Sequence, residues 1–130
     1  MVTSEDIERF LIRLELPYEE LRESMWLVGN GQEGVPPVVL NHTPPILLLR
    51  AEVMRTPDDE ELREGLFRSL LELNATDLVH GAYGLEGDDI VLTDALELAD
   101  LDFSEVQASL DSILLALSAH YKVLAHYRTP

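Results

Sequence analysis

Three stretches of this chain carry apolar residues at helical spacing, and groups of short apolar runs lie between them. The helical stretches cover about residues 4–15, 57–74 and 103–127, and the strand-like runs lie within residues 18–54 and 78–92. Single strands that alternate with helices would indicate a parallel sheet, and that alternation is absent. The pattern therefore predicts an α+β fold, an antiparallel five-stranded sheet with helices packed on it, in the order α-β-β-β-α-β-β-α.

Capping residues indicate where the three helices begin. Thr3 or Ser4 can accept a hydrogen bond from the first turn of the first helix. Thr56 followed by Pro57 predicts the start of the second helix, and Asp102 predicts the start of the third. The second helix is expected to end in the left-handed region near Asn74, and Gly65 and Ser69 give it a face of small residues.

The strand-like runs predict two groups of antiparallel strands joined by turns. Prolines at 36 and 37 place the second strand near an edge, because proline is not tolerated in central strands. The run of Ile and Leu that begins at Ile46 predicts a central strand buried on both faces. The five expected strands are Tyr18–Val28, Val35–Leu40, Ile46–Met54, Leu78–Leu85 and Ile90–Leu92.

The size and composition fit one globular domain over residues 1–130, since two cores would each have only about 65 residues. The chain has no cysteine, which excludes disulfides, thiolate metal sites and cysteine nucleophiles. Nine basic residues against 25 acidic ones give a net charge of -16. This charge opposes direct binding to nucleic acid and to anionic membranes. The acidic N-terminus lacks the features of a secretory signal, so we expect a cytoplasmic protein.

The acidic residues dominate one part of the chain. Residues 69–121 hold 11 acids and no Lys or Arg, whereas residues 1–68 hold 14 acids and seven arginines. Such a surface can serve solubility alone, can reflect a salt-adapted host, or can attract a basic partner protein or peptide.

No catalytic, metal-binding or cofactor-binding residues can be assigned from the sequence. The four histidines, at 42, 80, 120 and 126, lack the spacing of known metal motifs, and no serine lies in a nucleophile-elbow pattern. The acidic run at 58–61 fits the N-terminus of a helix better than a metal cluster. We therefore expect no enzyme activity, no cofactor and no metal.

Several stretches resemble the YbjN-like family of bacterial sensory transduction regulators, which has a type III secretion chaperone-like fold. They are Ile46–Met54, Leu70–Asn74, Gly81–Leu85, Ile90–Leu92 and the long helix after Leu101. The resemblance covers about the whole chain and implies the same fold. Secretion chaperones of this fold are small acidic homodimers that hold a partner segment in extended form. The resemblance brings no catalytic residues with it.

These observations favour a non-enzymatic protein-binding module, chaperone-like or regulatory, over two alternatives. One alternative is a small-ligand-binding or hydrolytic domain that uses dispersed carboxylates and histidines, and the other is a purely structural dimer. We expect a partner segment to bind across the first helix and a sheet edge, near Phe10, Leu14 and Trp26. The competing interpretation is that these three side chains belong to the core.

The helices also predict a homodimer. Three helices with apolar stripes present more apolar surface than one sheet covers easily, and the small-residue face at Gly65 and Ser69 offers close packing. The resemblance points to the same assembly. Because the net charge opposes association, the dimer contact must be apolar at its centre.

Overall fold

The computed structural model describes residues 1–29 and 35–128, which form three α-helices, six strands and a short 3-10 helix. Within these residues, no helix is both long and apolar enough to cross a membrane. In chain order the elements are α1 (Ser4–Leu14), β1 (Tyr18–Arg22), β2 (Met25–Val28), β3 (Val38–Thr43), β4 (Ile46–Arg55), α2 (Glu60–Thr76), β5 (Ala82–Glu86), β6 (Asp89–Glu97), α3 (Phe103–Leu124) and η1 (Ala125–Tyr127).

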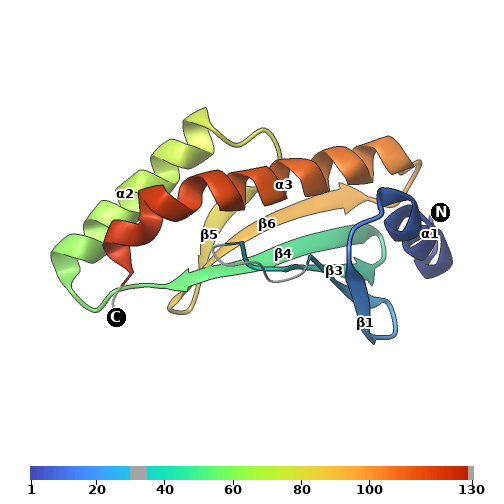
Figure 1. Ribbon diagram of the computed structural model, residues 1–130, viewed down its shortest axis with the longest axis horizontal. Helices are drawn as coiled ribbons and strands as arrows, with labels where there is room; N and C mark the ends of the chain where they lie inside the picture. Colours follow the sequence, from blue (N-terminus) through green and yellow to red (C-terminus); the bar gives the residue numbers. More distant parts are fainter. Residues whose placement is uncertain (30–34, 129–130) are drawn as a thin grey trace.

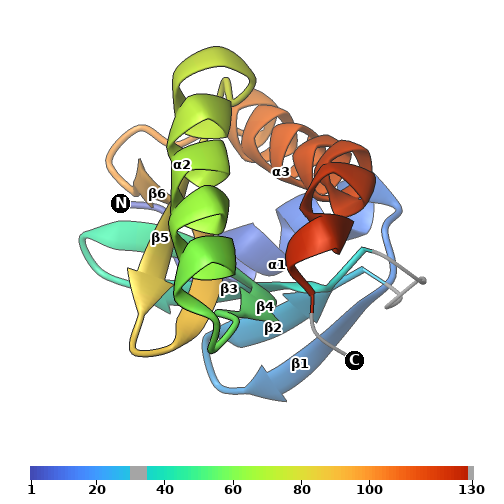
Figure 2. The same cartoon turned by 90° about the vertical axis from the view of Figure 1, so that its left-hand side faces the viewer.

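The six strands form one antiparallel sheet, in the order β1-β2-β3-β4-β6-β5. The three helices lie on one face of this sheet, with α1 near β1 and α2 near β5 (Figures 1 and 2). Strands β1 and β5 are the two edges. The predicted α+β class with one antiparallel sheet is therefore confirmed.

The sheet has six strands because the predicted strand Tyr18–Val28 is a hairpin of two strands. Strands β1 and β2 pair antiparallel, with Tyr18 opposite Val28 and Arg22 opposite Met25. The turn between them places Ser24 at φ 65°, in the left-handed region. Serine is not typical of turn positions in the left-handed region, where glycine and asparagine are usual. The sequence pattern therefore predicted one long strand.

The second and third predicted strands also differ from the structure in detail. Strand β3 begins at Val38 and lies between β2 and β4, so Pro36 and Pro37 precede an interior strand and do not mark an edge. The sequence Gly29-Asn30-Gly31 predicts a turn ahead of this strand, but residues 30 and 31 lie outside the described residues. Strand β4 is central as predicted, but its burial alternates, so only the face toward the helices is fully buried.

Helix α2 begins and ends later than its sequence signals suggest. Its N-cap is Asp59, whose side chain accepts a hydrogen bond from the Leu62 N–H, and Thr56 and Pro57 lie before the helix. The helix continues to Thr76, past the predicted end at Asn74. The other two caps match the prediction: Thr3 caps α1 and Asp102 caps α3.

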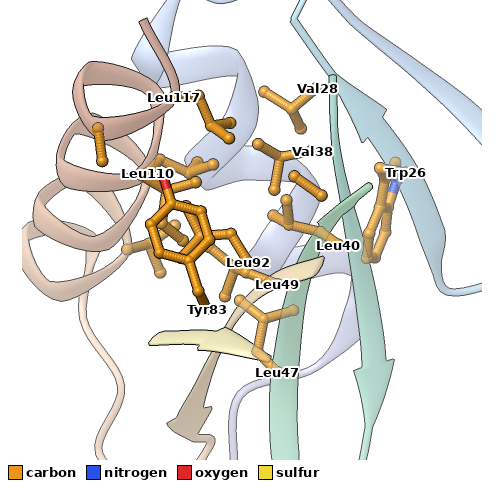
Figure 3. Close-up of a cluster of buried hydrophobic side chains, with 14 of the residues drawn as sticks. Trp26, Val28, Val38, Leu40, Leu47, Leu49, Tyr83, Leu92, Leu110 and Leu117 are labelled. Carbon is orange, nitrogen blue, oxygen red and sulfur yellow. The ribbon is translucent and has the colours of Figure 1, made fainter. Parts of the chain in front are cut away.

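The core lies between the helices and the covered face of the sheet. Helix α3 crosses β6 and β4, and its Leu110 and Leu117 point toward the buried side chains of the strands (Figure 3). Trp26 of β2 belongs to this core, with 2% of its surface exposed. Its indole Nε1–H is buried without a hydrogen-bond partner among the described residues.

A buried hydrogen-bond network joins α2, β5 and α3. The Tyr83 hydroxyl lies 2.7 Å from His120 Nδ1, and His120 Nε2 lies 3.1 Å from Asp77 Oδ2. Asn74 accepts from the Tyr83 N–H at 2.7 Å and donates to its carbonyl at 3.2 Å. Burial raises the pKa of Tyr83 to about 12. His120 is thus satisfied on both ring nitrogens, which explains how a histidine sits in the core.

We predict that Trp26→Ala destabilises the fold by about 3–5 kcal/mol, because it empties a large buried site. Trp26→Phe should cost less than half as much, since it keeps most of the ring and removes a buried N–H that has no partner. Urea unfolding of the two variants measures both values. A cost below about 1 kcal/mol for Trp26→Ala would contradict its place in the core.

We predict that Tyr83→Phe destabilises the fold by about 1–2 kcal/mol near neutral pH, because His120 Nδ1 loses its partner. The cost should shrink between pH 10 and about 12, where the unfolded tyrosine ionises while folded Tyr83 keeps its proton. Wild-type stability then falls by about 1.4 kcal/mol per pH unit from this group alone, and the variant lacks that loss. Unfolding curves at several alkaline pH values measure the difference, and a constant difference would refute the raised pKa.

Candidate functional site

Two of the four histidines are used in structural contacts. His120 lies in the buried network, and His42 Nε2 lies 2.9 Å from the Val2 carbonyl oxygen. Among residues 1–29 and 35–128, no three His or acidic side chains are grouped so as to hold a metal ion. The candidate sites described below are surfaces.

The three residues predicted to contact a partner lie at different depths around α1. Phe10 is half-buried and packs edge-on against Phe103 of α3, with ring centroids 6.1 Å apart. The Arg13 guanidinium lies over the Phe103 ring, 3.9 Å from its centroid. Leu14 is half-buried against the core. The structure therefore brings Phe10 and Leu14 to the same helix flank, whereas Trp26 is buried beneath it, as in the core interpretation.

The sheet edge beside α1 is β1, and it is exposed and acidic. From Glu19 to Arg22 every residue of β1 is exposed, and one side of the strand has no neighbouring strand among the described elements. Glu19 and Glu20 give this strand two exposed carboxylates, one on each face of the sheet. Leu21 and Ile12 add exposed apolar side chains on β1 and α1. This combination offers free backbone groups, apolar contact and negative charge in one place.

The other edge, β5, borders an apolar hollow beneath α2. The hollow has a volume of about 280 Å³ and includes Leu71 and Leu85, which are 68% and 53% exposed. At Gly84 an added Cβ would meet no atom within 4 Å, so the space beside this residue on the face opposite the helices is open. The full lining is Phe67, Leu70, Leu71, Asn74, Tyr83, Gly84, Leu85 and Ile90.

The predicted dimer residues Gly65 and Ser69 lie on the opposite flank of α2. A Cβ at Gly65 would lie 3.1 Å from the ring of Tyr127, and Ser69 Oγ lies 3.1 Å from the Tyr127 hydroxyl. The small residues thus make room for η1 of the same chain.

Sequence reasoning missed the exposed apolar residues Ile12, Leu71 and Leu85. Ile12 and Leu71 lie outside the core-facing stripes of α1 and α2. An apolar residue outside such a stripe is the sequence signal that could have identified them as exposed. Leu85 had no such signal, because its exposure depends on β5 being an edge.

An ion pair crosses the sheet on the face opposite the helices. Arg50 of β4 donates to both carboxylate oxygens of Glu86 on β5, at 2.7 and 3.2 Å, and also contacts Glu52 at 3.4 Å. The hydrogen bonds from Arg50 lower the pKa of Glu86, and those to Glu86 raise the pKa of Arg50. This pair fixes the Arg50 side chain across β6, which lies between β4 and β5.

Comparisons with solved structures show what this fold is similar to. The ExoU–SpcU complex of the Pseudomonas aeruginosa type III secretion system contains a chain with TM-score 0.69 and 16% identity, matching 89% of this chain and 95% of that one. YbjN from E. coli has a TM-score of 0.68 and 14% sequence identity, and the match covers 92% of each chain. A chain of the HopA1–SchA chaperone–effector complex has a TM-score of 0.62 and 13% sequence identity, and the match covers 88% of each chain. At these identities the likeness establishes the fold alone.

Comparison by sequence gives one family. No curated protein matches the chain. The family model CesT_Tir_1 matches residues 1–129, almost the whole chain. The expected resemblance to YbjN and to the secretion chaperones is thereby confirmed, and the chain belongs to the CesT_Tir_1 family, a type III chaperone family.

Proposed function

We propose that this chain is a non-enzymatic, chaperone-like module that holds a segment of a partner protein and works as a homodimer. The observation that carries the proposal is the pair of open sheet edges, each bordered by exposed apolar side chains. The similar ExoU–SpcU and HopA1–SchA structures are complexes of two different proteins, and the second is a chaperone with its effector. Both agree with a protein partner.

The β1 edge suits a partner segment in extended form. A strand added there would pair with the unpaired side of β1, and its alternate side chains would reach Leu21 on one face and the α1 flank with Phe10 and Leu14 on the other. Trp26 supports this edge from within the core. Backbone hydrogen bonds would give this site affinity for segments of many sequences. The apolar side chains around it would make it prefer segments with apolar residues at alternate positions.

Charge favours a basic or basic-flanked partner. Glu15, Glu19, Glu20 and Glu23 are exposed around β1, and the whole chain carries a net charge of -16. Complementary charge raises the rate of encounter, and salt screens it over a Debye length of about 8–10 Å.

The alternative of a small-ligand or hydrolytic domain has less support. The hollow under α2 is lined mainly by apolar side chains, and Asn74 and Tyr83 at its rim are already hydrogen-bonded to other groups. A ligand site usually offers several convergent polar groups that remain free to bind.

The dimer is proposed to form through β5 and the neighbouring flank of α2. Leu71, Leu85 and Phe67 give this face an apolar centre, and the free edge of β5 can pair with the β5 of a second copy. Such a contact is self-complementary, as two-fold symmetry requires. Gly65 and Ser69, on the opposite flank of α2 beside Tyr127, would then lie outside this contact.

We predict that a double reversal, Glu19→Lys with Glu20→Lys, slows association with a basic partner about three- to tenfold at low salt. The probe is a synthetic peptide whose apolar residues alternate with polar ones and whose ends carry lysines. Stopped-flow fluorescence measures the association rate. For the wild type, this rate should fall as salt rises.

The matched control is Glu61→Lys with Glu64→Lys on α2, which changes the net charge equally at exposed positions far from β1. This variant should keep most of the wild-type rate. An equal loss in both variants would show that only net charge matters and would remove the β1 edge from the proposal.

We predict that Leu71→Glu with Leu85→Glu converts a dimer to a monomer, because four buried carboxylates would meet at a two-fold contact. Light scattering at high micromolar concentration measures the mass. Salt should favour the wild-type dimer, since it screens repulsion between two chains of charge -16. Val79→Glu, at an exposed site outside this hollow, is the control and should remain dimeric. A monomeric wild type would refute the assembly.

A further inference from the structure

The face of the sheet opposite the helices carries apolar side chains on three neighbouring strands, with Asn41 of β3 between Met25 and Leu48. Antiparallel sheets with one open face normally carry polar residues there, and a continuous apolar area on a surface indicates an interaction site. We call this area the open-face patch. Its members are half-buried and come from β2, β3 and β4: Met25, Leu27, Val39, Ile46 and Leu48.

The open-face patch is hollowed on both sides of Val39. One hollow, of about 410 Å³, is bounded by Leu27, Pro36 and Pro37. The other, of about 280 Å³, is bounded by Leu21, Met25 and Leu48. Val39 and Arg50 line both hollows, so the two hollows adjoin.

The ion pair between Arg50 and Glu86 covers part of the β6 and β5 side of this face. Its side chains cross β6, and Val91 on that strand is only 3% exposed although it faces away from the helices. The surface that remains for a partner is therefore the β2–β4 side of the sheet.

Backbone hydrogen bonding decides which kind of segment fits this surface. Strands β3 and β4 are paired on both sides, so they have no free edge to offer. An extended segment lying on the face would bury its own N–H and C=O groups without partners, at about 1–3 kcal/mol for each group. A helix satisfies its own backbone, and helices pack on sheets by their apolar stripe, as α1–α3 do on the other face.

The charges around the patch indicate which polar residues the docked helix should carry. Glu19, Glu52 and Glu97 share this face with two arginines. The guanidinium of Arg50 is engaged by Glu86 and Glu52, and Arg22 Nε donates to Met25 Sδ at 3.4 Å, so the acids outnumber the cations. Basic residues beside the apolar stripe would complement these acids. A second copy of this chain would instead bring a further charge of -16.

From these observations we propose that an amphipathic helix, with basic residues flanking its apolar stripe, docks on the open-face patch. The inference rests on the proposed function in that the helix belongs to the bound partner protein. It adds a second mode of contact: an extended segment at β1 and a helix on the adjoining open face.

The test uses a fluorescent synthetic peptide of about 20 residues, long enough to form a helix. One side of its helix carries leucines and the flanks carry lysines. A control peptide has the same composition in an order that spreads the leucines around the helix. Fluorescence anisotropy should show binding of the striped peptide to the wild type and at least about tenfold weaker binding of the control peptide.

The protein variants locate the contact. Val39→Thr with Leu48→Thr should weaken binding of the striped peptide about tenfold, because both side chains keep their place but become polar. The matched control is Leu115→Thr on α3, which changes an apolar side chain that is 70% exposed on the helix-bearing side, and it should leave binding unchanged. If the double variant is poorly folded, methyl NMR of the wild type replaces it, and the peptide should shift Leu27, Val39 and Leu48 but not Leu115.

Equal binding of both peptides, unchanged binding by the double variant, or methyl shifts away from the patch would each overturn the inference. Self-association that disappears in the double variant, without binding of the striped peptide, would assign the patch to a second copy and also overturn it. The lysine-ended alternating peptide separates this inference from the proposed function. It should bind the Val39→Thr, Leu48→Thr variant normally, and failure of that peptide to bind the wild type would count against the β1 edge alone.

Discussion

The packing of α3 on one face of the sheet is the contact on which the rest of the structure depends. Eight residues of this helix are buried, and they meet the inward side chains of the strands, with α1 and α2 on either side. Because all three helices take the same face, the opposite face stays open, and β1 and β5 remain as edges (Figure 2). The candidate binding surfaces are thus the parts of a two-layer fold that its helices do not cover.

Local sequence signals were sufficient for α1 and α3, whose caps and apolar spacing lie within each helix. They failed where another part of the chain decides the outcome. The β1–β2 turn forms at Ser24 because the strands on either side pair, although serine is a weak turn signal. The prolines at 36 and 37 suggested an edge, but they lie just outside β3, where no ladder hydrogen bond is required of them.

The site was harder to predict for the same reason. The two-residue period of a strand says that Trp26 and Val28 share one face and Leu27 the other, but it does not say which face the helices will cover. The helices cover the face of Trp26, so its ring lies in the core and Leu27 joins the open-face patch. Likewise, Gly65 and Ser69 predicted close packing, but their neighbour is Tyr127, which is distant in sequence.

The order of the strands keeps the proposed contacts apart. Strands β1 and β5 are separated by five strand spacings, about 24 Å along the sheet. A dimer formed through β5 would therefore extend the sheet across two copies and leave a β1 edge at each outer end.

The open-face patch adjoins β1 and is separated from β5 by the Arg50–Glu86 pair. One partner chain could therefore pass from the β1 edge to the open face of the same copy without crossing the dimer contact. Its two segments would then bind at a high effective concentration, set by the short linker between them.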